Sequence, residues 1–174
     1  ESCPLNLAPT TSTTMMLVLG DAIALQLMDK KEFKKENFKS FHPGGMLGKS
    51  LLLVKDIMHT KDKLPLIKKD NTMREALLKM TSYGFGCVGI TNSKKHLIGI
   101  ITDGDLRRNI AKKFLDLPIE KIMTKNPVTV ESKMNIKDTI DIMNNNKITS
   151  VFVIKHNSKV AEGIIHIHDC IKIG

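Results

Sequence analysis

Two kinds of apolar pattern recur along the chain after residue 50. Four short runs are almost continuously apolar, as buried strands are: "GCVGIT", "LIGIIT", "TSVFVI" and "AEGIIHI". Ahead of each pair of runs the spacing becomes that of one helix face, i, i+3, i+4 and i+7. These helical positions are Met73, Ala76, Leu77 and Met80, and then Ile136, Thr139, Ile140 and Met143. The pattern predicts an α/β (α+β) fold with an aliphatic interior.

The same part of the chain is duplicated. "VKDIMHT" returns as "IEKIMTK" with the two methionines 65 residues apart, and Asp105 and Asp169 near the ends of the units lie 64 apart. A fixed spacing of this kind indicates repeated structural units. Each unit is a β-α-β-β-α sequence that starts with an irregular strand, "KLPLIKKD" or "PVTVESK". We expect the two units at residues 54–115 and 119–174.

Turn and capping residues mark the ends of these elements. Asn71 or Thr72 can begin the first helix and Gly84 can end it, while Asn144 to Asn146 can end the corresponding helix of the second unit. "NSKK" and "KHNSK" have the composition of hairpin loops between paired strands. A further helix is expected at "DGDLRRNIAKKF" and, in shorter form, at "HDCIKIG".

The first fifty residues lie outside the duplication. In "PTTSTTMMLVLGDAIALQLMDKK" a proline and a run of hydroxyl residues can cap a helix that is almost continuously apolar from Met15 to Met28. A helix that is hydrophobic nearly all round is buried inside a larger body. Nothing else in residues 1–50 could cover it. We therefore expect that the chain starts inside a domain whose earlier part is missing, or which another chain completes.

Composition limits the class of protein and the compartment in which we expect it. Hydrophobic residues make up 41% and aromatic residues 4% of the chain, which favours a packed globular protein with an aliphatic core. No apolar stretch is expected to reach the eighteen or so residues of a membrane helix, and the first residues lack the order of a signal peptide. Cys3, Cys87 and Cys170 show no metal-binding spacing and are expected to be reduced thiols in the cytoplasm. The sequence gives no sign of a metal or a cofactor.

The net charge of +9 would suit an anionic partner. The lysines are spread over the chain, however, and no nucleic-acid recognition motif accompanies them. Solvated lysine faces are therefore favoured over nucleic-acid binding, while sugar phosphates and nucleotides stay compatible with the charge.

His42 stands at a special position in "FHPGGMLGKS". Pro43 disfavours helix at the residue before it, and the two glycines that follow permit positive φ, so the sequence places His42 on a loop. Imidazole titrates near neutral pH. A proton-transfer role and a plain turn are both open on these residues.

The doubled unit carrying "GIITDGDL" resembles a tandem CBS-domain pair over about residues 54–174. In that family the strand end and the following Asp line a cleft between the repeats, where adenosine-type nucleotides often bind. The resemblance implies a ligand site at Thr102 and Asp105 and, in the second repeat, Asp169, with His166 where the second threonine would be. A threonine hydroxyl can hold phosphate and an Asp can accept ribose hydroxyls. The alternative is that both Asp residues simply cap helices.

His166 and His168 lie two positions apart, which would place them on the same side of a strand. A metal pair is conceivable, but no third ligand is evident in the sequence. A polar edge of the cleft is the favoured interpretation.

The first residues add a more specific resemblance. "ESCPLNLAPTTSTTMMLVLGDAIALQL", followed by "FHPGGMLGKSLLLVKDIM", is similar to the end of the sugar isomerase (SIS) domain of the bacterial D-arabinose 5-phosphate isomerases, which continues into a CBS pair. That family interconverts D-ribulose 5-phosphate and D-arabinose 5-phosphate on the route to the lipopolysaccharide sugar Kdo. The resemblance implies that residues 1–50 are a remnant of the isomerase domain, with Glu1 and His42 as catalytic residues.

The resemblance to the isomerases also has implications for the activity of this chain, its oligomeric state and its ligands. The family's other catalytic residues and its sugar-phosphate loop lie upstream, so we expect this chain to be inactive alone. A homo-oligomer (dimer or tetramer) and a nucleotide or nucleotide-sugar effector at the CBS cleft are expected. The alternative function is a non-catalytic CBS module for ligand binding or dimerisation.

Overall fold

The computed structural model of the chain describes residues 1–41, 51–109, 115 and 117–172, and it divides into two compact units, residues 1–48 and 49–174. The predicted catalytic His42 lies outside the described residues. Each unit is considered by itself.

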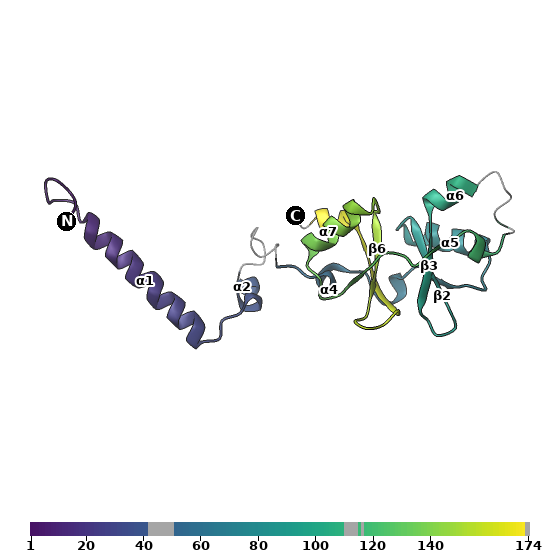
Figure 1. The fold of residues 1–174 in the computed structure, drawn as a ribbon, viewed down its shortest axis with the longest axis horizontal. Coiled ribbons are helices and arrows are strands. Elements are labelled where there is room, and N and C mark those ends of the chain that lie inside the picture. The colour runs from purple at the N-terminus through teal and green to yellow at the C-terminus, as the bar shows by residue number, and fades with distance from the viewer. Residues whose placement is uncertain (42–50, 110–114, 116, 173–174) are drawn as a thin grey trace. The chain divides into compact units, whose positions relative to one another are not determined.

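Unit 1 contains α1 (Thr10–Lys30) and α2 (Lys35–Phe41) (Figure 1). The apolar helix is confirmed, but its predicted hydroxyl cap is wrong. The helix begins directly after Pro9, so the hydroxyl residues lie inside its first turns, where the Thr14 hydroxyl donates to the Thr10 carbonyl. The Glu1 carboxylate caps the helix instead and accepts hydrogen bonds from the backbone N–H groups of Thr11 (2.7 Å) and Ser12 (3.2 Å).

The apolar side chains of α1 are exposed. Of the residues described, none in α1 is buried, and Met16 and Leu17 are 71% and 70% exposed. The helix is also long and apolar enough to cross a membrane by length and composition, which corrects the expectation that no stretch reaches that size. Asp21 and Gln26 interrupt its middle, and the core helix of a soluble protein meets the same criterion. The criterion is therefore weak evidence for a membrane span.

Unit 2 contains the two predicted β-α-β-β-α repeats (Figure 1). The first repeat begins with α4 (Val54–Ile57) and η1 (Lys61–Lys63) and continues with β1 (Leu66–Lys68), α5 (Met73–Tyr83), β2 (Cys87–Thr91), β3 (Leu97–Thr102) and α6 (Asp103–Asn109). The second begins with η4 (Ile119–Lys121) and β4 (Thr124–Lys125) and continues with β5 (Thr129–Glu131), α7 (Ile136–Asn145), β6 (Ser150–Ile154), β7 (Ala161–His166) and α8 (Ile167–Ile171).

The two sheets have the same plan. Their strand orders are β1-β2-β3-β4 and β5-β6-β7, and in each the first pair is parallel and the second antiparallel. In the first sheet, Thr124 of β4 pairs with Ile100 of β3. In the second, an isolated bridge joins His59 to Ile164 at the corresponding position of β7. His59 and Thr124 are thus structural equivalents.

Local sequence explains the helix ends. Thr72 caps α5 through a reciprocal pair of hydrogen bonds with Glu75, two residue types that favour a helix start. The helix ends at Gly84, whose φ of +69° is a conformation that glycine adopts at little cost. Asn135 caps α7, and Asn146 ends it as predicted.

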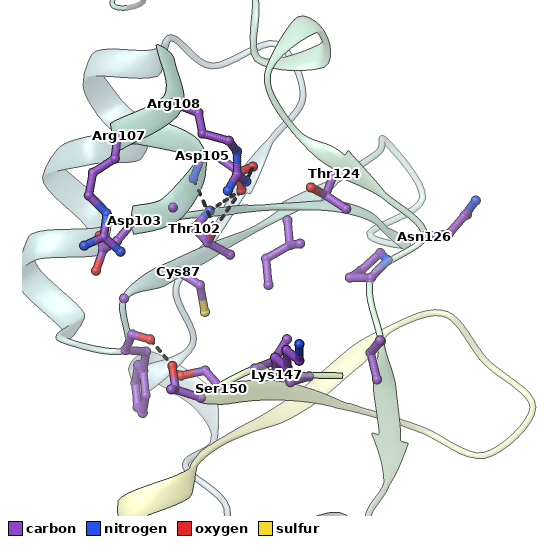
Figure 2. Close-up of a pocket in the computed structure, with 18 residues that line it drawn as sticks. Cys87, Thr102, Asp103, Asp105, Arg107, Arg108, Thr124, Asn126, Lys147 and Ser150 are labelled. Carbon is purple, nitrogen blue, oxygen red and sulfur yellow. Dashed lines mark hydrogen bonds and ion pairs between the residues drawn. The ribbon is translucent and has the colours of Figure 1, made fainter. Parts of the chain in front are cut away.

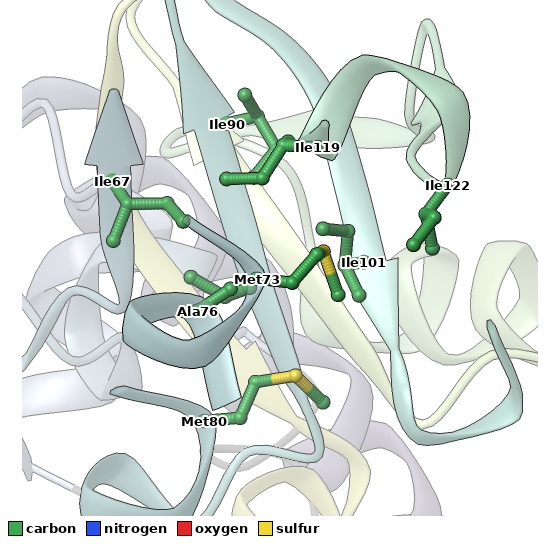
Figure 3. Close-up of a cluster of buried hydrophobic side chains, with 9 residues drawn as sticks. Ile67, Met73, Ala76, Met80, Ile90, Ile101, Ile119 and Ile122 are labelled. Carbon is green, nitrogen blue, oxygen red and sulfur yellow. The ribbon is translucent and has the colours of Figure 1, made fainter. Parts of the chain in front are cut away.

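Each repeat has its own hydrophobic core, but each core is completed by the first segment of the other repeat. Ile119 and Ile122, at the start of the second repeat, pack with Ile90 and Ile101 of the first (Figure 3). Val54, at the start of the first repeat, is buried in the core of the second. The two segments are therefore exchanged between the repeats.

Two glycines make room for the exchanged segments. A Cβ added to Gly99 would lie 2.6 Å from the Sδ of Met123, and one added to Gly163 would lie 2.5 Å from the Sδ of Met58. A third buried cluster contains residues of both sheets and joins the repeats, with Phe152 fully buried in it. The repeats thus form one packed body.

The exchange makes a testable prediction about stability. Ile119→Ala removes a side chain that is 1% exposed from the core of the first repeat and is expected to lower the free energy of unfolding by about 2–5 kcal/mol. Ile171→Ala, at a position that is 59% exposed, is the matched control and should stay within about 0.5 kcal/mol. Urea unfolding of both variants makes the comparison. Equal effects would contradict a core built from the exchanged segment.

Candidate ligand-binding site between the repeats

A cavity of about 540 Å³ lies between the two repeats of unit 2. Its walls come from the start of β2, the β3–α6 junction, the segment 124–128 and the turn that leads from α7 into β6 (Figure 2). Cavities of this size are typical of small-molecule sites. Ile100, Val128 and Ile148 supply apolar wall, and charged groups stand at the α6 side.

Thr102 and Asp105 meet at the junction of β3 and α6. The Oδ2 atom of Asp105 accepts from the Thr102 backbone N–H (2.9 Å) and hydroxyl (2.7 Å), and the Asp105 N–H donates back to the Thr102 hydroxyl (3.3 Å). This reciprocal pair caps α6 and fixes a carboxylate that is only 6% exposed. Asp105 therefore caps a helix and lines the cavity at once.

The second oxygen of Asp105 has a partner of a different kind. Oδ1 accepts from Nη2 of Arg108 at 2.6 Å, and the Arg108 side chain is 69% exposed. Gly104 lies under this guanidinium, since an added Cβ would come within 3.2 Å of its Nη1. The pair faces the cavity from a wall that also carries Arg107 (Figure 2).

Lys147 adds a cation from the second repeat. It follows the Asn146 cap of α7 and has a φ of +54°, so a left-handed turn brings it to the cavity wall. With Arg107 and Arg108 it gives the lining three cations against the carboxylates of Asp103 and Asp105. These three cations were not among the predicted site residues. For Arg107 and Arg108, their position in "DLRR", directly after the Thr-Asp motif, was the available signal.

Cys87 and Ser150 form the floor of the cavity (Figure 2). Ser150 donates its hydroxyl to the Phe85 carbonyl at 2.7 Å, a hydrogen bond between the repeats. Burial raises the pKa of the Cys87 thiol to about 12, so it stays protonated at neutral pH. Cys87 and Cys170 are buried free thiols, whereas Cys3 is partly exposed.

The equivalent site in the second repeat is built differently. Asp169 accepts from the His166 backbone N–H at 3.1 Å, and His166 caps α8 by accepting the His168 N–H on its Nδ1. The same Oδ2 atom of Asp169 also contacts Nε2 of His59 at 3.0 Å. His59 was not among the predicted site residues, although its position in the duplicated "DIMHT" segment matches that of Thr124.

The histidines do not form a metal site among the described residues. His168 lies in the first turn of α8 rather than on a strand, so the prediction of two histidines on one strand face is wrong. Burial and the neighbouring His168 lower the pKa of His166, with Asp169 opposing them. In the part of the chain that the structure describes, no three His, Cys, Asp or Glu side chains are grouped to hold a metal ion.

Glu1, the other predicted catalytic residue, lies in unit 1 as the cap of α1. Hydrogen bonds from the Ser12 hydroxyl and backbone and from the Thr11 backbone lower its pKa. It is therefore a carboxylate at neutral pH in this conformation.

Comparison with known proteins identifies unit 2. The CBS domain family matches residues 54–112 and 119–174. The chain belongs to the CBS-domain family. The cavity is therefore the cleft between two CBS repeats, and the motif residues Thr102 and Asp105 line it.

Curated relatives extend the similarity into unit 1. The chain is 41% identical over 177 residues to the arabinose 5-phosphate isomerase KdsD of Escherichia coli (strain K12) and to that of Salmonella typhi, covering 100% of this chain and 53% of each relative. It is 39% identical over 166 residues to the uncharacterized protein RP505 of Rickettsia prowazekii, covering 95% of this chain and 51% of that protein. The chain thus spans about half the length of the curated relatives it matches.

Solved structures agree on the fold. The CBS domain pair of protein MJ0100, solved with 5′-methylthioadenosine and S-adenosyl-L-methionine, has a TM-score of 0.63 and 24% identity, covering 71% of this chain and 95% of that one. CBSX2 in complex with AMP has a TM-score of 0.59 and 19% identity, covering 69% and 93%. At this level of identity the likeness shows the fold.

The thiol environments predict an order of reactivity. Thiolate is the reactive form, and a pKa of about 12 leaves Cys87 about a thousandfold less ionised near pH 8 than a thiol at the ordinary 9.0. Cys3, whose pKa is lowered by hydrogen bonds from backbone N–H groups of Ala8 and its neighbours, should react first with iodoacetamide. Mass spectrometry at increasing times checks the order, and Cys3→Ser should remove the fast phase. Early labelling of Cys87 in the folded chain would contradict the buried floor.

Proposed function

We propose that this chain is the C-terminal part of an aldose-ketose isomerase that interconverts D-ribulose 5-phosphate and D-arabinose 5-phosphate in the cytoplasm, as a homo-oligomer. The observation that carries this proposal is the 41% identity to arabinose 5-phosphate isomerases over the whole chain, including unit 1. A CBS module with a separate history would be expected to match only over unit 2. The name of these relatives supports a place early in the synthesis of Kdo for lipopolysaccharide.

The proposed chemistry uses residues of the first unit. Isomerisation moves a proton between C1 and C2 through an enediol, which requires a base at carbon and an acid or a proton relay at oxygen. We assign Glu1 and His42 to this set. The lowered pKa of Glu1 suits a base or a charge-stabilising group better than a proton donor. His42, with an imidazole that titrates near neutral pH, suits ring opening or proton relay.

The proposed role of the CBS cleft is to bind a nucleotide or nucleotide sugar that regulates the isomerase. Two groups of residues that line the cavity, aliphatic and cationic, support a nucleotide-type ligand. Aliphatic side chains such as Ile100 and Val128 can cover a base, and Arg107 and Lys147 can neutralise phosphate from the two repeats. Crystal structures of related pairs with AMP and with S-adenosyl-L-methionine support an adenosine-type ligand.

Asp105 is the proposed ribose acceptor. Its Oδ2 atom is committed to Thr102, but Oδ1 is paired with an arginine whose side chain is 69% exposed. The arginine end of this ion pair is solvated, whereas the carboxylate is buried and needs a donor on Oδ1. Ribose hydroxyls can take the place of Arg108 as donors to Oδ1, which frees the guanidinium for phosphate.

The isomerase proposal predicts where activity resides. The intact gene product should convert D-ribulose 5-phosphate, and the 174-residue chain should not. In the intact protein, His42→Ala is expected to lower kcat by about 10²–10⁴-fold, the usual contribution of a positioned acid-base group. His156→Ala is the control, because His156 lies in the second CBS repeat, where its 71% exposed side chain pairs with Glu131.

Inactivity of the intact protein would refute the isomerase and favour a non-catalytic CBS module. Activity of the 174-residue chain would contradict a catalytic site that needs preceding residues. Size-exclusion chromatography with light scattering on the same samples tests the proposed oligomer.

The ligand proposal predicts a loss of affinity on Asp105→Asn. A hydrogen bond to a charged group contributes about 1.5–3 kcal/mol, so AMP binding measured by calorimetry should weaken about 10–150-fold. Asparagine keeps an oxygen for the α6 cap, and urea unfolding verifies that the variant is folded. Asp141→Asn, on the exposed part of α7, is the control. Unchanged affinity in Asp105→Asn would overturn the assignment of Asp105.

A further inference from the structure

The duplicated fold creates two equivalent clefts, and the residues around them can be compared pair by pair. Asp105 corresponds to Asp169 by the 64-residue spacing, and Thr124 corresponds to His59 by the matching β-bridges to Ile100 and Ile164. The exchanged methionines that precede Thr124 and His59 lie against equivalent glycines. The two clefts therefore differ in side chains and share their backbone plan.

The carboxylates of the two clefts have partners from different places. The Asp105 carboxylate is bonded by Thr102 and Arg108, which both lie on its own junction. Asp169 is contacted by its own junction at His166 and also by His59, which is 110 positions away in sequence. The His59–Asp169 pair is thus a contact across the second cleft, joining the exchanged segment to the α8 junction.

The size of the side chain at the Thr124/His59 position is a second difference between the two clefts. Thr124 lines the 540 Å³ cavity of the first cleft. Its counterpart His59 packs its ring edge to face against Phe85, with the ring centroids 5.1 Å apart. The side chains of His59 and Asp169 are 29% and 23% exposed. An imidazole ring thus stands where the first cleft has a small side chain.

We propose that His59 closes the second CBS cleft by binding Asp169 and packing on Phe85, so that each chain takes one nucleotide, in the Asp105 cleft. This inference rests on the proposed ligand function of that cleft. His166, which stands where the first cleft has Thr102, completes the closure. Its side chain has no hydroxyl to bind a ligand, and its Nδ1 already accepts the His168 N–H.

The test is the stoichiometry of AMP binding to the 174-residue chain, measured by calorimetry and equilibrium dialysis. The wild-type chain should bind one AMP. Asp105→Asn should weaken this one site about 10–150-fold, and Asp169→Asn should leave one site of wild-type affinity. The double variant His59→Thr/His166→Thr copies the first cleft and should bind two, of which one keeps its affinity on the addition of Asp105→Asn. His156→Thr is the control for loss of a histidine outside the clefts.

Different failures separate the two proposals. Two AMP per wild-type chain, or one site of wild-type affinity left in Asp105→Asn, would overturn the closure while keeping the nucleotide function. A double variant that stays at one would overturn the assignment of His59. If no form binds AMP, the ligand proposal fails, and the closure is judged by the ¹⁵N chemical shift of His59 Nε2. That shift should move on Asp169→Asn, and an unchanged shift would overturn the contact.

Discussion

The exchange of short segments between the two repeats is the constraint on which unit 2 depends. A repeat of about sixty residues buries little surface by itself and forms a marginal core. The segment with Ile119 completes the first core, and the segment with Val54 completes the second. Because Gly99 and Gly163 lack side chains, the methionines of these segments can lie against the sheets. Neither repeat can therefore be removed without opening the core of the other.

The exchange also determines what faces the clefts. The residue after each exchanged methionine lies beside the strand that ends in the capping motif, so it stands near the Asp of that motif. In one cleft this residue is Thr124, and in the other it is His59. A threonine leaves a cavity, whereas an imidazole can reach the carboxylate across the cleft. A symmetrical backbone thus produces two unlike sites through single side chains.

The sequence predicts those parts of the fold that depend on local patterns. The apolar spacing predicts both repeats with their helices, and Thr72 and Gly84 mark helix ends because capping involves residues only a few positions apart. Thr102 and Asp105 follow from a motif whose contacts are equally local. The exchange is not predicted, because nothing within residues 54–60 indicates which sheet the segment joins.

The remaining site residues depend on long-range geometry. Lys147 reaches the cavity through a left-handed turn, and His59 reaches Asp169 through a bridge to a strand more than one hundred residues later. The glycines opposite the two methionines, together with the fixed repeat spacing, were the available signals for both the exchange and His59. For α1, the long apolar run predicts the helix but not its cap, because a loop separates Glu1 from the start of the helix.

The unequal clefts bear on how the proposed ligand would change the structure of unit 2. A ligand changes activity only if it binds two states of the protein with different affinity. The open cleft has walls from both repeats, so its ligand is sensitive to their separation, whereas the His59–Asp169 contact holds the other side together. If the proposed ligand regulates activity, the simplest motion that these contacts permit is a pivot of the first repeat about the His59–Asp169 contact.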